Sequence, residues 1–287
     1  MKIIVPQNAG VCWGVERAID MAYKTVETPT QHHIVSLGPL VHNPEVVEDF
    51  KQKGVEVVNN LEEAKEGTVI FRSHGVPVQY YNDAKSKNLK VVDATCPFVK
   101  RSQNYARRLS RQGYFVVIVG DEKHPEMKSV RSFVEGPHIV SMDPKIVDQI
   151  PSTQKVGIVA QTTVPLTMLE AMVSKAQKRF PEVKVHDTIC DATKVRQEEA
   201  AETAKQVDCM IIIGGRESSN TKKLTKICKE IQPKSFEIEH EREIDFSWFQ
   251  GVQVLGITAG ASTPVPVIQL VCDYILSNLS FKASSSF

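Results

Sequence analysis

Three segments of the chain each run from a short apolar stretch through a turn to a cysteine and then into a helical pattern. They span residues 3–12, 91–96 and 183–190, and they end on Cys12, Cys96 and Cys190. In parallel α/β folds, ligands and nucleophiles sit in the turns that follow the carboxyl ends of strands. The recurrence predicts several α/β units, each with a cysteine at the start of a helix.

Glycines repeat the same spacing. Gly38, Gly120 and Gly214 follow the three cysteines by 26, 24 and 24 residues. Alternating strands and helices with such spacing predict three similar α/β repeats with mainly parallel sheets and right-handed crossovers. We expect repeats at 14–96, 97–189 and 190–287.

The third repeat ends on a helical pattern and lacks a strand–cysteine segment of its own. Residues 1–13, with Ile3 to Val5 as the strand, supply that missing piece. We therefore expect the N-terminal strand to pair within the third sheet. The three repeats would then surround a pseudo-threefold axis, on which the three cysteines converge around a central metal centre.

Composition narrows the classes of function. The net charge of +1 gives no electrostatic reason to expect nucleic acid or an anionic membrane as a partner. The late apolar stretch 266–279 is shorter than the roughly 20 residues of a membrane span, and we expect a helix there. No signal-peptide pattern is found, and six cysteines in a chain with cytoplasmic character favour metal binding, catalysis or burial over disulfides.

The six cysteines fall into two groups. Cys209, Cys228 and Cys272 stand in apolar contexts and are interpreted as small core residues. Three convergent thiolates at Cys12, Cys96 and Cys190, with no fourth cysteine in an equivalent turn, suit a metal centre that keeps one position open for substrate. An iron–sulfur cube with one free iron is the favoured interpretation. A zinc site completed by a histidine is the alternative.

Hydroxyl and imidazole side chains follow several of the same strands. Ser218-Ser219-Asn220 comes after a glycine-led strand end and just before a helix, where backbone N–H groups and the helix dipole favour an anion. Simple N-capping is the competing interpretation, and it must hold for at least one of these residues. Capping does not account for Ser262, His42 and His74 at the other loop ends. An anion site is therefore the hypothesis.

Motifs in order along nearly the whole chain resemble the LytB/IspH family of diphosphate reductases. They are Gly10-Val11-Cys12-Trp13-Gly14-Val15, Val41-His42-Asn43, Ser73-His74-Gly75, Asp93-Ala94-Thr95-Cys96-Pro97, His124-Pro125-Glu126, Gln161-Thr162-Thr163, Ser218-Ser219-Asn220 and Thr258-Ala259-Gly260-Ala261-Ser262. Trp13 departs from the small residue expected beside the first cysteine. It leaves the ligand in place and changes only the packing near it.

The resemblance implies a 4Fe–4S cluster held by Cys12, Cys96 and Cys190, with one iron that no cysteine ligates. It implies that Glu126 and Thr162 lie near the substrate hydroxyl as catalytic residues. It also implies a diphosphate site built from His42, His74, His124, Ser218, Ser219, Asn220 and Ser262. A first-turn glutamate that merely complements a helix dipole is the competing interpretation of Glu126.

The reaction that the resemblance implies is the last step of the methylerythritol phosphate route to isoprenoids. Two electrons and two protons remove water from 4-hydroxy-3-methylbut-2-enyl diphosphate and leave isopentenyl and dimethylallyl diphosphate. Because no flavin or nicotinamide motif is visible, a one-electron donor such as ferredoxin or flavodoxin is expected as partner. No nucleic acid or membrane partner is expected, and the expected compartment is the cytoplasm.

Two alternatives stay open at this point. Quinolinate synthase also resembles three α/β units around a three-cysteine cluster, and would bind carboxylates in place of a diphosphate. A non-catalytic protein that senses or stores metal could use the same thiolates. A substrate assay, pyrophosphate inhibition and the metal content of the purified protein distinguish the three.

Overall fold

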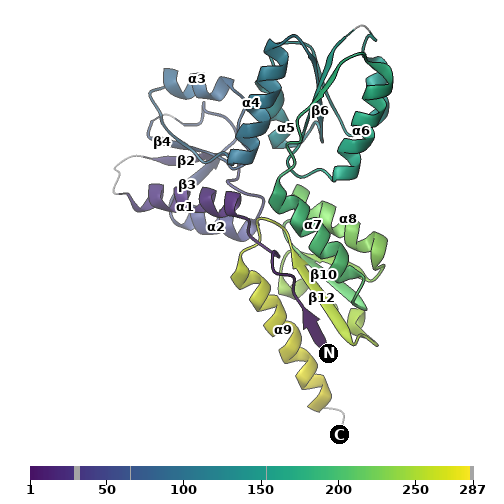
Figure 1. The fold of residues 1–287 in the computed structure, drawn as a ribbon. Coiled ribbons are helices and arrows are strands. Elements are labelled where there is room, and N and C mark those ends of the chain that lie inside the picture. Colours follow the sequence, from purple (N-terminus) through teal and green to yellow (C-terminus); the bar gives the residue numbers. More distant parts are fainter. Residues whose placement is uncertain (29–32, 65, 153, 285–287) are drawn as a thin grey trace. The chain divides into compact units, whose positions relative to one another are not determined.

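The computed structural model describes residues 1–28, 33–64, 66–152 and 154–284, and Figure 1 shows its elements. The described residues form three sheets, each of four parallel strands. The first sheet has the order β3-β2-β4-β5, the second β7-β6-β8-β9 and the third β1-β12-β10-β11. The predicted α/β class with three similar units is confirmed.

The strands are short and rich in β-branched residues, as buried parallel strands require. The first sheet contains β2 (Ile34–Leu37), β3 (Val55–Val58), β4 (Thr68–Phe71) and β5 (Lys90–Asp93). The second contains β6 (Phe115–Val119), β7 (His138–Ser141), β8 (Val156–Ala160) and β9 (Val183–Val185). The third contains β1 (Lys2–Ile4), β10 (Cys209–Ile213), β11 (Ser235–Ile238) and β12 (Val254–Ala259).

Helices cover both faces of every sheet in the same order. The helix after each cysteine and the next helix share one face, and the third helix of the repeat covers the other. The helices are α1 (Trp13–Glu27), α2 (Pro44–Gln52), α3 (Gln79–Ser86), α4 (Pro97–Arg111), α5 (Pro125–Ser132), α6 (Leu166–Arg179), α7 (Asp191–Ala204), α8 (Ser219–Ile231) and α9 (Val265–Ser284).

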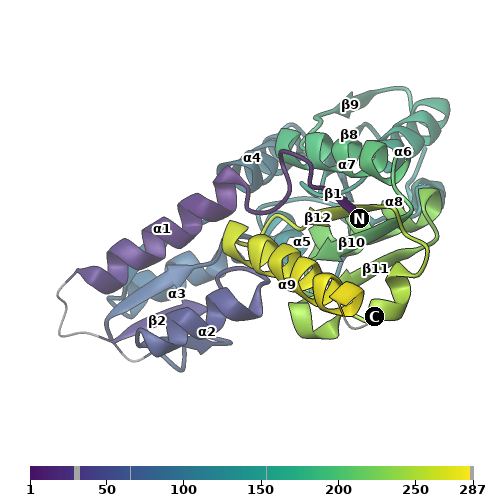
Figure 2. The same ribbon diagram turned by 90° about the horizontal axis from the view of Figure 1, so that it is seen from below.

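The third sheet shows this layering most directly. Ile211 and Ile213 of β10 pack with α9, whereas Met210 and Ile212 point to the opposite face and pack with α7 and α8. Figure 2 shows α9 running along its side of the strands. The alternation follows from the two-residue period of a strand.

The N-terminal strand pairs where the sequence predicted. Ile3 of β1 lies opposite Leu255 of β12 in parallel register. In its sheet β1 has the position that β5 and β9 have in the other two, beside the last-but-one strand of the repeat. The expectation that residues from the start of the chain complete the third sheet is confirmed.

The chain divides into two compact parts. The central part comprises 14–41 and 45–190 and holds the first two sheets. The terminal part comprises 1–13, 42–44 and 191–287 and holds the third sheet. The residue bounds predicted for the three repeats stay a prediction. The predicted third repeat, 190–287 together with 1–13, differs from the terminal part in two ways: it includes Cys190 and it lacks residues 42–44.

Some local structure differs from expectation. β12 runs to Ala259, so the first two residues of the Thr258-Ala259-Gly260-Ala261-Ser262 motif are strand residues that pair with Ile212 and Ile213 of β10. Three short 3₁₀ helices were not expected: η1 (Pro144–Gln149), η2 (Glu241–Glu243) and η3 (Phe246–Phe249). Among the described helices, none is long and apolar enough to cross a membrane.

Candidate functional site

One backbone hydrogen bond recurs at all three cysteine turns. Each cysteine donates its N–H to a carbonyl oxygen in the loop that follows the neighbouring strand. The pairs are Cys96 to Ser73 at 2.9 Å, Cys190 to Thr162 at 2.9 Å, and Cys12 to Ala261 at 3.2 Å. Each thiol is thereby held at the carboxyl end of its own sheet and immediately before a helix.

The two cysteine turns of the central part are also built alike. Three residues before each cysteine, an aspartate accepts a hydrogen bond from a backbone N–H two residues on: Asp93 from Thr95 at 3.0 Å and Asp187 from Ile189 at 2.9 Å. Such Asx turns close the strand-to-helix corner locally.

Asp93 has further partners. Its carboxylate also accepts from the Tyr81 hydroxyl at 3.2 Å and binds the Lys100 ammonium at 2.7 Å. Burial alone would raise the pKa of Asp93, but the bonds from Lys100 and Thr95 outweigh it and hold the pKa below its ordinary value. The carboxylate is therefore ionised near neutral pH.

The Cys12 turn is held by a different device. Gly10 has φ +93°, and a side chain there would meet Thr263 and Ile268. The buried Arg196 of α7 donates to the carbonyl oxygens of Asn8 and Gly10, both at 2.9 Å. Sequence reasoning missed Arg196, since an arginine inside an ordinary helical pattern gives no sign of a partner 186 residues away.

Gly14 brings helix α1 against the Cys96 thiol. A Cβ built at Gly14 would lie 2.6 Å from Cys96 Sγ, far inside van der Waals contact. Only glycine leaves that sulfur its place, which is a reason for the Gly14 of the first motif that the sequence alone did not reveal.

The other three cysteines have the environment expected of core residues. Burial raises the pKa of the Cys209 thiol to about 11 and that of Cys228 to about 12, and it also raises the pKa of Cys272. Cys209 and Cys228 are fully buried, and the partly buried Cys272 packs against the core under α9. These thiols stay protonated at neutral pH and are poor candidates for metal ligands.

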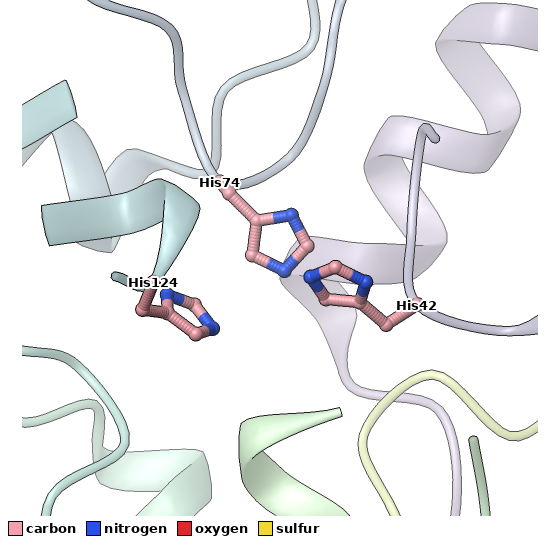
Figure 3. Close-up of side chains that lie close together, drawn as sticks. All are labelled: His42, His74 and His124. Atoms are coloured by element: carbon pink, nitrogen blue, oxygen red, sulfur yellow. The ribbon is translucent and has the colours of Figure 1, made fainter. Parts of the chain in front are cut away.

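His74 and His124 form a pair in the central part. Their rings are 5.5 Å apart between centroids and meet edge to face (Figure 3). The His74 loop turns at Gly75, whose φ is +73°. A side chain at Gly75 would collide with Gln103 of α4 and Ser129 of α5, so helices of the second repeat fix a loop of the first.

Beside this pair lies a buried carboxylate. Oε1 of Glu126 accepts the backbone N–H of Thr162 and Oε2 accepts its hydroxyl, both at 2.7 Å. The exposed fractions are 2% for Glu126 and 7% for Thr162. His124 Nδ1 accepts the N–H of Glu126 at 3.2 Å and so caps α5, which leaves Nε2 to carry the proton of the neutral ring. Glu126 is therefore buried and hydrogen-bonded, unlike a first-turn glutamate that only complements a dipole in solvent.

The residues expected at the other end of the anion site lie in the terminal part. The Ser262 hydroxyl donates to the His42 carbonyl at 3.1 Å, and Asn43 Nδ2 donates to the Ser262 carbonyl at 2.9 Å. A side chain at Gly215 would lie 2.6 Å from the His42 carbonyl oxygen. Sequence reasoning gave no role to Asn43 or Gly215, although both fix this loop.

Ser218 is an N-cap, as one interpretation held. Its hydroxyl accepts the N–H of Thr221 at 3.4 Å, and its own N–H donates to Gly215 at 2.8 Å. Ser219 and Asn220 form the first turn of α8 and are partly exposed. The start of α8 thus lies beside the His42 loop.

The expected site residues fall on two continuous series of contacts, one in each part. In the central part the series runs from Cys96 through the Ser73–His74 loop, His124, Glu126 and Thr162 to Cys190. In the terminal part it runs from Cys12 through the Ala261–Ser262 loop and His42 to Gly215 and Ser218. The convergence of the two series on one cavity stays a prediction.

Comparison with known proteins agrees with the motifs. A family model described as "LytB protein" matches residues 3–276. The chain belongs to the LytB family.

Relatives of this LytB chain cover nearly its whole length. A protein of Geobacter sulfurreducens named 4-hydroxy-3-methylbut-2-enyl diphosphate reductase is 47% identical, over 96% of this chain and 97% of its own. One of the same name from Trichlorobacter lovleyi is 48% identical, over 95% and 97%.

Solved structures extend the likeness to the fold. A structure titled as (E)-4-hydroxy-3-methyl-but-2-enyl diphosphate reductase, the terminal enzyme of the non-mevalonate pathway, is 41% identical with a TM-score of 0.72. It covers 96% of this chain and 99% of its own. The Plasmodium falciparum reductase structure, at 24% identity and a TM-score of 0.89, covers 96% of this chain and 87% of its own and shows the same fold.

Proposed function

We propose that this LytB protein is an iron–sulfur oxidoreductase that converts 4-hydroxy-3-methylbut-2-enyl diphosphate to isopentenyl and dimethylallyl diphosphate. The observation that carries the proposal is the pair of contact series. Each links turn cysteines with the imidazole and hydroxyl groups expected to bind the substrate. Two electrons and two protons enter, and one water leaves.

Cys12, Cys96 and Cys190 are proposed to hold a 4Fe–4S cluster with one iron that no cysteine ligates. The donor set fits, because the turn thiols precede helices whereas the core thiols of Cys209 and Cys228 are fully buried. Gly14 lies against Cys96 Sγ and is two positions after Cys12, a step of at most about 7 Å of extended chain. When bound, such a cluster supplies electrons singly and a Lewis-acidic iron for an oxygen ligand.

The diphosphate is proposed to bind between imidazole and hydroxyl donors and the start of α8. The first turn of that helix offers the positive end of a helix dipole. The proposed contacts are His42, His74, His124, Ser218, Ser219, Asn220 and Ser262. In the neutral form described above, His124 still presents an Nε2–H donor to an anion.

Glu126 and Thr162 are proposed to deliver the proton that turns the departing hydroxyl into water. The carboxyl group is buried and already bonded to the Thr162 hydroxyl, which can accept and donate in turn. Glu126→Gln keeps the shape and removes the acid. We expect turnover to fall by about 10² to 10⁴, with substrate affinity and iron content retained.

The measurement for Glu126→Gln is iron content, substrate affinity and rate on one anaerobic sample. Thr162→Val, which removes only the hydroxyl, is the matched variant, and its rate should fall less because water can partly replace the relay. A full rate in Glu126→Gln with an intact cluster would reduce Glu126 to a capping-turn carboxylate.

Electrons are proposed to come one at a time from ferredoxin or flavodoxin, with the protein in the cytoplasm and no nucleic-acid or membrane partner.

The decisive test of function is protein purified without oxygen, measured for iron, sulfide and absorbance and then assayed with the diphosphate substrate and a chemical reductant. About four irons and four sulfides per chain, turnover, and inhibition by pyrophosphate are expected. Zinc with no turnover would instead indicate a metal-storage protein.

A further inference from the structure

A groove runs along helix α4 from the residue that follows Cys96. It encloses about 430 Å³ and is lined by Pro97, Lys100, Arg101, Asn104, Tyr105 and Arg108. Helix α4 belongs to the central part, and Figure 1 shows it beside α5 and β6. None of these residues has a role in the proposed diphosphate site.

The groove concentrates positive charge. Helix α4 contains one lysine and four arginines and no aspartate or glutamate, whereas the whole chain has 35 basic and 34 acidic residues. Within the described ranges, no carboxylate lies at ion-pair distance from Arg101 or Arg108, and Arg108 is exposed. From Lys100 to Arg111 the cations extend over about 17 Å of helix.

An aromatic stack forms the side of the groove. The ring of Tyr105 lies on that of His186, with centroids 4.0 Å apart and planes 14° from parallel. Burial, followed by the nearby charges of Lys184 and Arg108, lowers the pKa of His186. The imidazole is therefore neutral at neutral pH and packs as an aromatic surface. A flat aromatic patch bordered by arginines is the composition that protein interfaces favour.

The groove touches both cysteine turns of the central part. Pro97 follows Cys96 directly, and Lys100 binds the Asp93 of that turn. Arg101 Nη2 donates at 3.3 Å to the carbonyl of Ile189, the residue before Cys190. A partner in this groove would lie against the backbone that carries two of the three proposed cluster ligands.

We propose that the α4 groove is the docking surface for an acidic one-electron carrier protein. The inference rests on the proposed function, whose reaction consumes two electrons for each product. Each docked carrier gives one electron and leaves oxidised, so two dockings and two protons accompany each product and water. The length of the basic stripe exceeds that of a diphosphate and matches an acidic patch on a protein.

The test is Arg108→Glu, with the exposed Arg242→Glu of η2 as the matched control for the same charge change. The probe is an acidic [2Fe–2S] ferredoxin, with a flavodoxin as the second arm. In Arg108→Glu we expect ferredoxin affinity, measured by calorimetry on the oxidised carrier, to fall at least about tenfold and KM for reduced ferredoxin to rise in parallel. Arg242→Glu should match wild type.

Turnover driven by dithionite-reduced methyl viologen, cluster absorbance and pyrophosphate inhibition should be unchanged in Arg108→Glu. Rising salt should weaken ferredoxin binding to wild type more than to the variant. Equal ferredoxin affinity in Arg108→Glu and wild type would overturn the proposal, as would a changed pyrophosphate inhibition, which would place the anionic substrate in the groove. An equal loss in Arg242→Glu would also overturn it.

The experiments distinguish a failure of the proposed function from a failure of the docking proposal. If wild type shows no viologen-driven turnover of the diphosphate, the function is wrong, while calorimetry still reports whether the groove binds the carrier.

Discussion

The first two sheets and the third reach the same topology by different routes. β5 and β9 follow the other strands of their own sheets directly in sequence. The cysteines that come after them, Cys96 and Cys190, immediately precede α4 and α7. The third sheet receives β1 from the opposite end of the chain, in the same sheet position, and β1 carries Cys12 into α1. The position of a cysteine is therefore set by its place in a sheet and not by its neighbours in sequence.

The cysteine turns of the first two sheets and of the third sheet are also held by different contacts. In the first two sheets a local aspartate closes the corner before the cysteine, at Asp93 and at Asp187. In the third, Arg196 holds the carbonyl oxygens of Asn8 and Gly10 from a distant helix. A local turn forms whenever its strand forms, whereas the Cys12 turn depends on long-range assembly. The following changes test that contrast.

The largest effect is expected from the cysteines themselves. If the three turns are equivalent, Cys12→Ser, Cys96→Ser and Cys190→Ser should each lose most of the iron and more than about 10² in rate, because a hard hydroxyl replaces a soft thiolate. Cys209→Ser, Cys228→Ser and Cys272→Ser are the controls and should keep their iron. Iron analysis and viologen-driven rates provide the comparison, and a control that loses iron while a turn variant keeps it contradicts the assignment.

Deleting residues 1–11 should destabilise the sheet that borrows its strand. Ile3 and Ala9 pack on the core of the terminal part, and β12 loses a paired neighbour. Amide hydrogen exchange should speed up in β10 and β12 and stay unchanged in β6 and β8, which act as the internal control. Unchanged protection of β10 and β12 would mean that β1 contributes nothing to the third sheet.

A smaller effect is expected when only the Arg196 side chain is shortened. Arg196→Met should cost about 2–3 kcal/mol in the unfolding of the terminal part, because the part-buried Asn8 and buried Gly10 carbonyl bonds lose their charged donor. In metal-free protein, Cys12 should then react with a thiol reagent faster than in wild type, with Cys96 unchanged. Lys205→Met, just beyond α7, is the exposed control. Equal Cys12 labelling rates in wild type and variant would show that Arg196 does not hold the turn.

The smallest effect is expected from the ion pair at the Cys96 turn. Asp93→Asn keeps the acceptor for Thr95 and loses the ionic bond to Lys100, which should cost about 1 kcal/mol at pH 7. The pKa of Asp93 is lower in the folded state than in the unfolded state. Its contribution to the free energy of unfolding is therefore fully present above the unfolded-state pKa, which is about 3.9, and disappears as pH falls through the folded-state pKa.

Urea unfolding from pH 7 to pH 2 should therefore show the gap between wild type and Asp93→Asn closing in acid. A gap that does not change with pH would contradict the role given to Lys100.

Much of this molecule follows from patterns a few residues long. The β-branched runs predict the strands, and the spacing of Gly38, Gly120 and Gly214 behind the cysteines predicts the repeat. The structure gives the physical reason for the glycine spacing, because each of these glycines donates its N–H to the carbonyl oxygen of the last residue of the adjacent edge strand. The missing strand of the third repeat even predicts that the N-terminal strand pairs within the third sheet. These inferences succeed because strand periodicity, turn chemistry and sheet connectivity are local or countable properties.

Tertiary structure alone decided which distant groups hold each site residue. No periodicity shows that Gly14 lies against the Cys96 sulfur, that Arg196 binds the Gly10 carbonyl, or that Thr162 places two donors on Glu126. Each of these contacts joins residues between 36 and 186 positions apart. Their partners are selected by packing geometry across elements, which a single sequence does not encode in any local pattern. The sequence predicts which residues carry the chemistry, and the fold determines what holds them in place.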